Sequence, residues 1–282
     1  MTLGIATILP EDWPLPAGTF LAVEFVFLFI TGCAHRRTAP SRTDAHRAQL
    51  PLVSPTVPHP TTQPPSTQPA PARPAAPPFA AEIEAFERAD KTNPPPQNAI
   101  LFVGSSSIRL WKTLAEDFAD LTVINRGFGG SQVADSVRYA DRIVLPYRPK
   151  VVVLYAGDND LAAGKSPQQV LADFEAFSGK VHAALPDTPV LYLSIKPSVA
   201  RWHLIDKIRE ANRLIEQYAG GTQGKVVYVD VFTPLLTPDG QPRPDLLIAD
   251  GLHLNAEGYK LWTPIVRKEL DRILSNRRAE RK

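Results

Sequence analysis

Short apolar runs rich in β-branched residues alternate with amphipathic stretches over the C-terminal part of this chain, and no other feature limits the fold as strongly. The runs predicted as buried strands are residues 100–103, 121–124, 151–155, 190–193 and 226–229. Strands that alternate with helices form a parallel sheet covered by helices on both faces. We therefore predict an α/β domain.

The stretches between these runs carry apolar residues at helical spacing. They include Val170, Phe174, Phe177 and Val181, then Leu204, Ile208, Ala211, Ile215 and Tyr218, and finally Trp262, Ile265, Val266 and Ile273. Such stripes are core by default, and we assign them no functional role. Because ligands of open parallel sheets bind beyond the carboxyl ends of the strands, functional residues are expected in the loops that follow the strands.

The segment before this domain has a different composition. From Thr38 to Pro78 the chain consists mainly of Pro, Thr, Gln and Ala, with few large apolar residues. Such a segment buries too little surface to offset the entropy lost on ordering. We predict a disordered Pro/Thr-rich linker over residues 34–78 and a folded domain over residues 79–282.

The lone cysteine, Cys33, closely follows a short apolar run at residues 20–30. That run is too short to span a bilayer, which takes about 20 helical residues, but it suits the apolar region of a signal peptide. Small residues before a lone cysteine resemble a bacterial lipobox. Residues 1–33 are therefore predicted to be a signal peptide with a lipobox, and Cys33 a lipid anchor that holds an extracytoplasmic protein at the membrane of the cell envelope. The alternative is a plain signal peptide or an uncleaved anchor in which Cys33 is incidental.

Charge and cysteine content exclude several classes of partner. The formal net charge is +2, which gives no electrostatic case for nucleic acid. A single cysteine excludes an internal disulfide framework and a cysteine-rich zinc site.

The first predicted strand ends in Gly104-Ser105-Ser106-Ser107 and leads into a predicted helix at residues 108–118. A serine on a strand-to-helix turn projects its hydroxyl from the sheet edge, near the positive end of a helix dipole. Serines also serve as ordinary helix N-caps, so this loop alone leaves both interpretations open. A phosphate-binding loop is a further alternative, but the Gly-x4-Gly-Lys pattern is missing.

Two further strands end in loops with candidate hydrogen-bond donors. The second leads into residues 125–131, where three glycines in four residues (Gly127, Gly129 and Gly130) form a tight turn or expose backbone N–H groups as oxyanion donors. The third leads into residues 157–160, Gly-Asp-Asn-Asp, where polar side chains follow a close backbone approach.

The last loop, Asp250-Gly251-Leu252-His253, precedes the final helix, for which Asn255 is a candidate N-cap. An aspartate and a histidine three residues apart share a turn, so the carboxylate fixes the imidazole tautomer. A structural histidine is the plain alternative. Metal ligation is another, but the glycine loops offer no third or fourth ligand of the usual kind.

Taken together, the four loops resemble the four sequence blocks of the SGNH/GDSL hydrolases, from the first strand to the last helix. The resemblance implies that Ser106 is the nucleophile of a triad completed by Asp250 and His253. It implies an oxyanion hole made by the N–H groups of Ser106 and Gly130 and by the side chain of Asn159.

The resemblance also implies a flavodoxin-like three-layer α/β/α fold with a five-stranded parallel sheet. Ester hydrolysis by such a triad needs neither metal nor cofactor. One residue departs from the family pattern: Ser105 stands where the family usually has aspartate. Because that aspartate is not itself catalytic, the mechanism is expected to be intact. Ser105 and Ser107 are expected to form hydrogen bonds within the turn.

We therefore expect a serine esterase that hydrolyses short-chain carboxylic esters, acetyl groups in particular, on a small ester or an acylated saccharide. The brief loops and the missing apolar lid favour short acyl groups. A lysophospholipase or thioesterase of the same family is one alternative. A non-catalytic glycan-binding module on the same fold is another, but such a module would not require all five polar positions.

Overall fold

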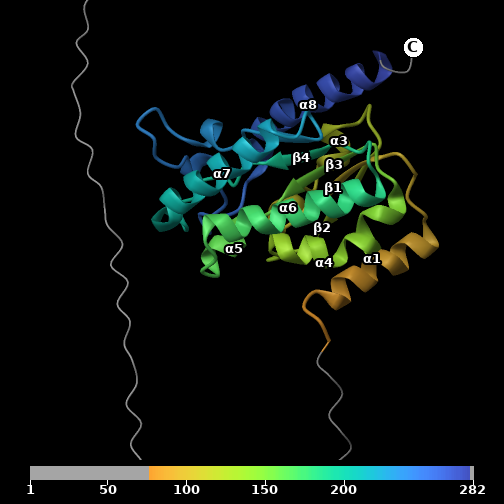
Figure 1. The fold of residues 1–282 in the computed structure, drawn as a ribbon. Coiled ribbons are helices and arrows are strands. Elements are labelled where there is room, and N and C mark those ends of the chain that lie inside the picture. The colour runs from red at the N-terminus through yellow and green to blue at the C-terminus, as the bar shows by residue number, and fades with distance from the viewer. Residues whose placement is uncertain (1–75, 280–282) are drawn as a thin grey trace, which may run out of the picture. The chain divides into compact units, whose positions relative to one another are not determined.

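The computed structural model describes residues 76–279 (Figure 1). The predicted signal peptide, Cys33 and the predicted linker up to residue 75 lie outside these residues. Among the helices of residues 76–279, none combines the length and apolar character that crossing a bilayer would require.

Five parallel strands form one sheet in the order β2-β1-β3-β4-β5, as the flavodoxin-like expectation requires. The strands are β1 (Ile100–Gly104), β2 (Val123–Gly127), β3 (Val151–Tyr155), β4 (Val190–Leu193) and β5 (Val226–Val229). Gly104 at the end of β1 pairs with Gly127 of β2 and with Tyr155 of β3. The carboxyl ends of these strands therefore meet at one edge, and the strand order reverses between β1 and β3, where such sheets bind ligands.

Helices cover both faces of the sheet, which gives the predicted three layers (Figure 1). The helices are α1 (Ala80–Thr92), α2 (Ser106–Arg109), α3 (Leu114–Asp117), α4 (Val133–Ile143), α5 (Asp158–Ala162), α6 (Pro167–Ala184), α7 (Ile205–Gly220) and α8 (Ala256–Ala279). Short 3-10 turns lie at Leu145–Tyr147, Trp202–Leu204, Thr233–Leu235 and Pro244–Leu246. Asn255 caps α8 as predicted, since its Oδ1 accepts a hydrogen bond from the N–H of Gly258 at 3.0 Å.

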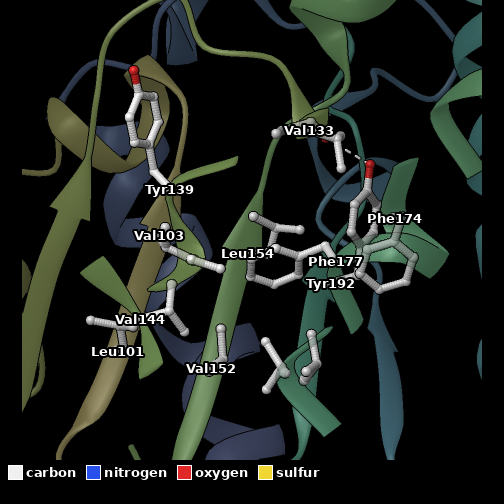
Figure 2. Packing of buried hydrophobic residues seen from close by; sticks show 14 of the residues in the cluster. Leu101, Val103, Val133, Tyr139, Val144, Val152, Leu154, Phe174, Phe177 and Tyr192 are labelled. Carbon is white, nitrogen blue, oxygen red and sulfur yellow. Dashed lines mark hydrogen bonds between the residues drawn. The ribbon is translucent and has the colours of Figure 1, made fainter. Parts of the chain in front are cut away.

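Successive strand residues point to opposite faces and thereby create two apolar cores. Leu101 and Val103 of β1 join Val152 and Leu154 of β3 beneath α4 and α6, where Phe174 packs (Figure 2). The intervening strand residues pack on the opposite face, against α2, α3 and α8. Because the central strands are buried on both faces, their sequences are continuously apolar.

Two predicted elements differ from the structure. The second strand was predicted at residues 121–124, but β2 runs from Val123 to Gly127, because its pairing with β1 begins at Val123. The single helix predicted at 108–118 is two short helices, α2 and α3. In the break between them, Trp111 is buried and stacks on Tyr259 of α8, with ring centroids 5.1 Å apart.

A helix before the first strand, α1, was not predicted. Its side chains are mostly exposed or half-buried, and Ile83 is its buried residue, so it lacks a strong apolar stripe. Polar contacts to the domain hold it: Glu87 accepts two hydrogen bonds of 2.6 Å from Arg142, and Asp90 accepts one of 2.5 Å from Tyr147.

Candidate active site

Ser106 lies at the carboxyl end of β1, in a turn that only glycine can begin. Gly104 has a φ of 126°, and a Cβ there would lie 2.0 Å from the carbonyl oxygen of Tyr155. The chain then enters α2 at Ser106. Ser105 and Ser107 are buried, whereas Ser106 is partly exposed. Of the three adjacent serines, Ser106 is therefore the one that a substrate can reach.

The expected hydrogen-bonding role of Ser105 is not seen. Within residues 76–279 its Oγ is buried and has no hydrogen-bond partner. The turn is held instead by its backbone, since the N–H of Ser105 donates to the carbonyl of Tyr155 at 2.8 Å.

Ser106, His253 and Asp250 form one continuous hydrogen-bonded chain. The Nε2 atom of His253 lies 2.9 Å from the Oγ of Ser106, and its Nδ1 atom lies 2.6 Å from Oδ2 of Asp250. An ionised carboxylate only accepts hydrogen bonds, so it selects the imidazole tautomer that carries the proton on Nδ1. In that tautomer Nε2 is an acceptor, and it faces the serine hydroxyl.

The turn that carries the acid and the histidine also orients the carboxylate. Oδ1 of Asp250 accepts the backbone N–H groups of Leu252 at 2.8 Å and of His253 at 3.0 Å. Burial opposes ionisation of Asp250, but the hydrogen bonds from the His253 side chain and from these two N–H groups outweigh it and lower the pKa of Asp250 to about 2. The carboxylate is therefore ionised at neutral pH.

The second and third loops meet at the carboxyl edge of the sheet. Gly130 is exposed and has a φ of 81°, and the Nδ2 of Asn159 donates to the carbonyl oxygen of Ser131 at 3.0 Å. Gly157, with a φ of 124°, begins the turn into α5, and a Cβ there would lie 2.7 Å from the side chain of Ile195. The two regions predicted as oxyanion donors are thus adjacent in space.

Asp160, the last residue of the third loop, has a structural role. It is fully buried, accepts the backbone N–H of Val133 at the start of α4, and pairs with Lys165 at 2.9 Å. Burial raises the pKa of Asp160, although Lys165 opposes this.

Two basic residues at the site, Lys196 and Arg201, were not predicted. The fully buried Nζ of Lys196 donates to the carbonyl of Leu252 at 2.6 Å, and burial lowers the pKa of Lys196. Arg201 donates to Oδ1 of Asn159 at 2.8 Å and pairs with Asp158 at 2.9 Å. Both residues follow the carboxyl end of the buried strand β4. Their position after a predicted strand could have marked them as candidate site residues.

Within the described part of the chain, His, Cys, Asp and Glu side chains do not gather into a group of three or more that could hold a metal ion. The proposed anchor Cys33 lies outside the described residues.

Comparison with known proteins places this geometry in context. The model of the GDSL-like lipase/acylhydrolase family matches residues 102–261, which include all four loops. No curated protein matches the chain. A solved structure described as a platelet activating factor from Streptococcus pneumonia has 25% identity and a TM-score of 0.60, and the match covers 67% of this chain and 92% of that one.

Two further solved structures are similar in fold. A GDSL-like lipase from Bacteroides thetaiotaomicron has 20% identity and a TM-score of 0.59, with 68% of this chain and 98% of that chain covered. A carbohydrate esterase family 3 protein from Talaromyces cellulolyticus has 20% identity and a TM-score of 0.52, with coverages of 63% and 98%. Likenesses at this identity concern the fold alone.

Proposed function

Because this chain belongs to the GDSL-like lipase/acylhydrolase family, and is therefore a carboxylic ester hydrolase, we propose that it is a serine esterase acting through Ser106, His253 and Asp250. The observation that carries this proposal is the continuous hydrogen-bonded chain from Ser106 Oγ through the imidazole to the Asp250 carboxylate. This series of hydrogen bonds ends at the partly exposed hydroxyl of Ser106, which lies at the edge of the sheet where substrates bind.

In the proposed reaction, Ser106 Oγ attacks the ester carbonyl carbon while Nε2 of His253 takes the hydroxyl proton. Asp250 stabilises the imidazolium that forms. The tetrahedral intermediate collapses, the bond to the alcohol oxygen breaks, and the imidazolium gives its proton to the leaving alcohol. Water then attacks the acyl-serine with His253 as base, which releases the carboxylic acid and restores the serine.

The negative oxygen of the intermediate needs hydrogen-bond donors. We assign this role to the N–H groups of Ser106 and Gly130 and to the Nδ2 of Asn159. Removing one such donor typically lowers kcat about 10²–10³-fold. The adjacency of Asn159 and the Gly130 loop supports the assignment.

The exposure of the site supports the proposal that the substrate carries a short acyl group and is itself accessible. The side chain of Asp250 is 42% exposed and that of His253 is 23% exposed, so the proposed triad is open to solvent. Among the described residues, the exposed large apolar side chains are Val199 and Ile248. Val199 lies against Gly251, and the N–H of Ile248 donates to the carbonyl of His253. Both side chains thus lie beside the Asp250–His253 turn and offer a small apolar contact for a substrate.

The substrate proposal is an acetyl or other short-chain ester, on a small molecule or on a saccharide. One similar fold is described as a carbohydrate esterase, which is a reason to test acylated sugars. A lysophospholipase needs a longer apolar contact than Val199 and Ile248 provide, and the thioesterase alternative is distinguished by the test that follows.

The test is hydrolysis of an acyl-chain series of aryl esters, alongside acetylated sugars, a lysophospholipid and an acyl thioester. We expect kcat/KM to be highest for acetyl and to fall as the chain lengthens, with no loss of activity after treatment with a chelator. A preference for long chains, or for the lysophospholipid, would contradict the substrate proposal. Chelator-sensitive activity restored by added zinc would contradict the serine mechanism.

A further inference from the structure

The segment after β4 belongs to none of the four family-like loops, yet it contacts two of them. Arg201, in this segment, reaches the proposed oxyanion donor: its Nη2 donates to Oδ1 of Asn159 at 2.8 Å. We propose that Arg201 is a positioning residue that sets the orientation of the Asn159 amide, so that its N–H, and not its oxygen, faces the reacting carbonyl. This inference rests on the proposed serine-esterase function.

The reason is the symmetry of the amide group. The Oδ1 and Nδ2 atoms of asparagine are nearly equal in size but opposite in polarity, so packing alone does not distinguish the two orientations. Rotating the amide by half a turn would place Nδ2 against the Arg201 guanidinium, with donor facing donor. It would also place Oδ1 against the carbonyl of Ser131, with acceptor facing acceptor.

The hydrogen-bond count of Asn159 leaves one donor free for catalysis. Oδ1 accepts from Arg201, and one N–H of Nδ2 donates to the carbonyl of Ser131. The amide group has two N–H bonds, so one stays available for a developing oxyanion. An amide turned the other way would present its carbonyl oxygen and repel that charge.

Arg201 is itself held by an ion pair. Its Nη1 lies 2.9 Å from Oδ2 of Asp158, and the exposed fractions of the two side chains are 17% and 6%. Its backbone neighbour Ala200 donates to the carbonyl of Gly251 at 3.0 Å, in the turn between Asp250 and His253. The Ala200–Arg201 segment therefore links the oxyanion side of the site to the acid–base side.

The decisive measurement is a double-mutant cycle on full-length protein with a short-chain aryl ester. Asn159→Ala should lower kcat about 10²–10³-fold. Arg201→Ala should lower kcat about 10–100-fold with little change in KM, because the donor is misplaced but still present. In the Asn159→Ala background, Arg201→Ala should cause little further loss, since there is no amide left to orient. Losses that multiply in the double variant would overturn the proposal, as would a raised KM at unchanged kcat.

A second variant separates positioning from the structural ion pair with Asp158. Arg201→Lys keeps a positive charge beside Asp158 but lacks the planar fork that serves Asp158 and Asn159 together. We expect Arg201→Lys to preserve the midpoint of thermal unfolding and to lower kcat nearly as much as Arg201→Ala does. This variant keeps the proposal testable even if Arg201→Ala does not fold. Full turnover in Arg201→Lys would overturn it.

Two controls complete the design. Arg213→Ala removes an exposed arginine of α7 that pairs with Glu210, and it should leave kcat unchanged. Ser106→Ala tests the underlying function. If turnover survives in Ser106→Ala, the serine mechanism is wrong. If turnover depends on Ser106 but the losses of the two single variants multiply in the double variant, only the role of Arg201 is wrong.

Discussion

His253 Nε2 lies 2.9 Å from Ser106 Oγ, although 147 residues separate the two in the chain. The sheet explains this proximity: Ser106 follows the interior strand β1, and His253 lies in the long segment that returns after β5. The acid partner is local by contrast, since Asp250 is three residues from His253 in the same turn.

The serine triplet gives the sharpest prediction. Ser106→Ala should abolish turnover except for a residual rate about 10³ over water, because the nucleophile is lost while other donors are kept. Ser105→Ala should keep activity and stability, since the Ser105 Oγ makes no hydrogen bond within residues 76–279 that could be lost. Ser107→Ala should also keep measurable turnover. A fluorophosphonate should label a single peptide in the wild type and fail on Ser106→Ala. Labelling that disappears in Ser105→Ala instead would move the nucleophile by one residue.

The pH dependence should report the histidine and not the aspartate. The pKa of Asp250 is about 2, so this carboxylate stays ionised as the pH falls from 7 toward 4. Protonation of the imidazole removes the general base and should therefore produce the acid limb of kcat/KM. Asp250→Asn should lower kcat by up to about 10⁴-fold, because the amide favours the wrong tautomer. An acid limb close to pH 2 in the wild type would instead assign it to Asp250.

Gly104 should be essential for stability. A Cβ there would lie 2.0 Å from the Tyr155 carbonyl oxygen and would force β1 away from β3. We expect Gly104→Ala to lower the free energy of unfolding by about 3 kcal/mol or more. Gly164 is the matched control, because it also has positive φ but a Cβ there meets no atom within 4 Å. Gly164→Ala should cost only about 1–2 kcal/mol, measured by chemical denaturation. Equal losses in the two variants would show that backbone conformation, and not the close approach, is decisive.

The apolar pair beside the turn should affect substrate binding. Val199→Ser removes an exposed apolar contact of about 1 kcal/mol, which corresponds to roughly a fivefold change in affinity. We expect KM for a butyryl ester to rise by about that factor while kcat and the acetyl ester change less. An equal loss for both esters would indicate that Val199 supports the turn and does not contact the acyl group.

Anchoring by Cys33 remains a proposal that lipid labelling can test. Cys33 is the chain's only cysteine, so it is the one thiol that acylation could use. In a bacterial host, Cys33→Ala should abolish palmitate incorporation and release the protein from the membrane fraction. Unchanged labelling in that variant would discard the lipoprotein interpretation.

The sequence alone determined the class of the fold, because strands that are buried on both faces of the sheet have continuously apolar sequences. Strands β3, β4 and β5 lie at residues 151–155, 190–193 and 226–229, as predicted. At the edge strand β2 the prediction shifted, because Asn125 and Arg126 are polar and only half-buried, which interrupts the apolar run. The helix α1 has no strong apolar pattern in its sequence, since polar contacts hold much of it in place.

The sequence also placed Ser106 and Asn159 in loops that directly follow strands, and Asp250 and His253 in the loop before the last helix. Their catalytic roles remain predictions for the experiments above. Tertiary structure alone decided which of three serines is accessible, because burial depends on the whole fold. It alone brought Arg201 to Asn159, 42 residues away, and Lys196 to Leu252, 56 residues away. No local pattern encodes such contacts, since they arise only when the sheet places the ends of β3, β4 and the last loop side by side.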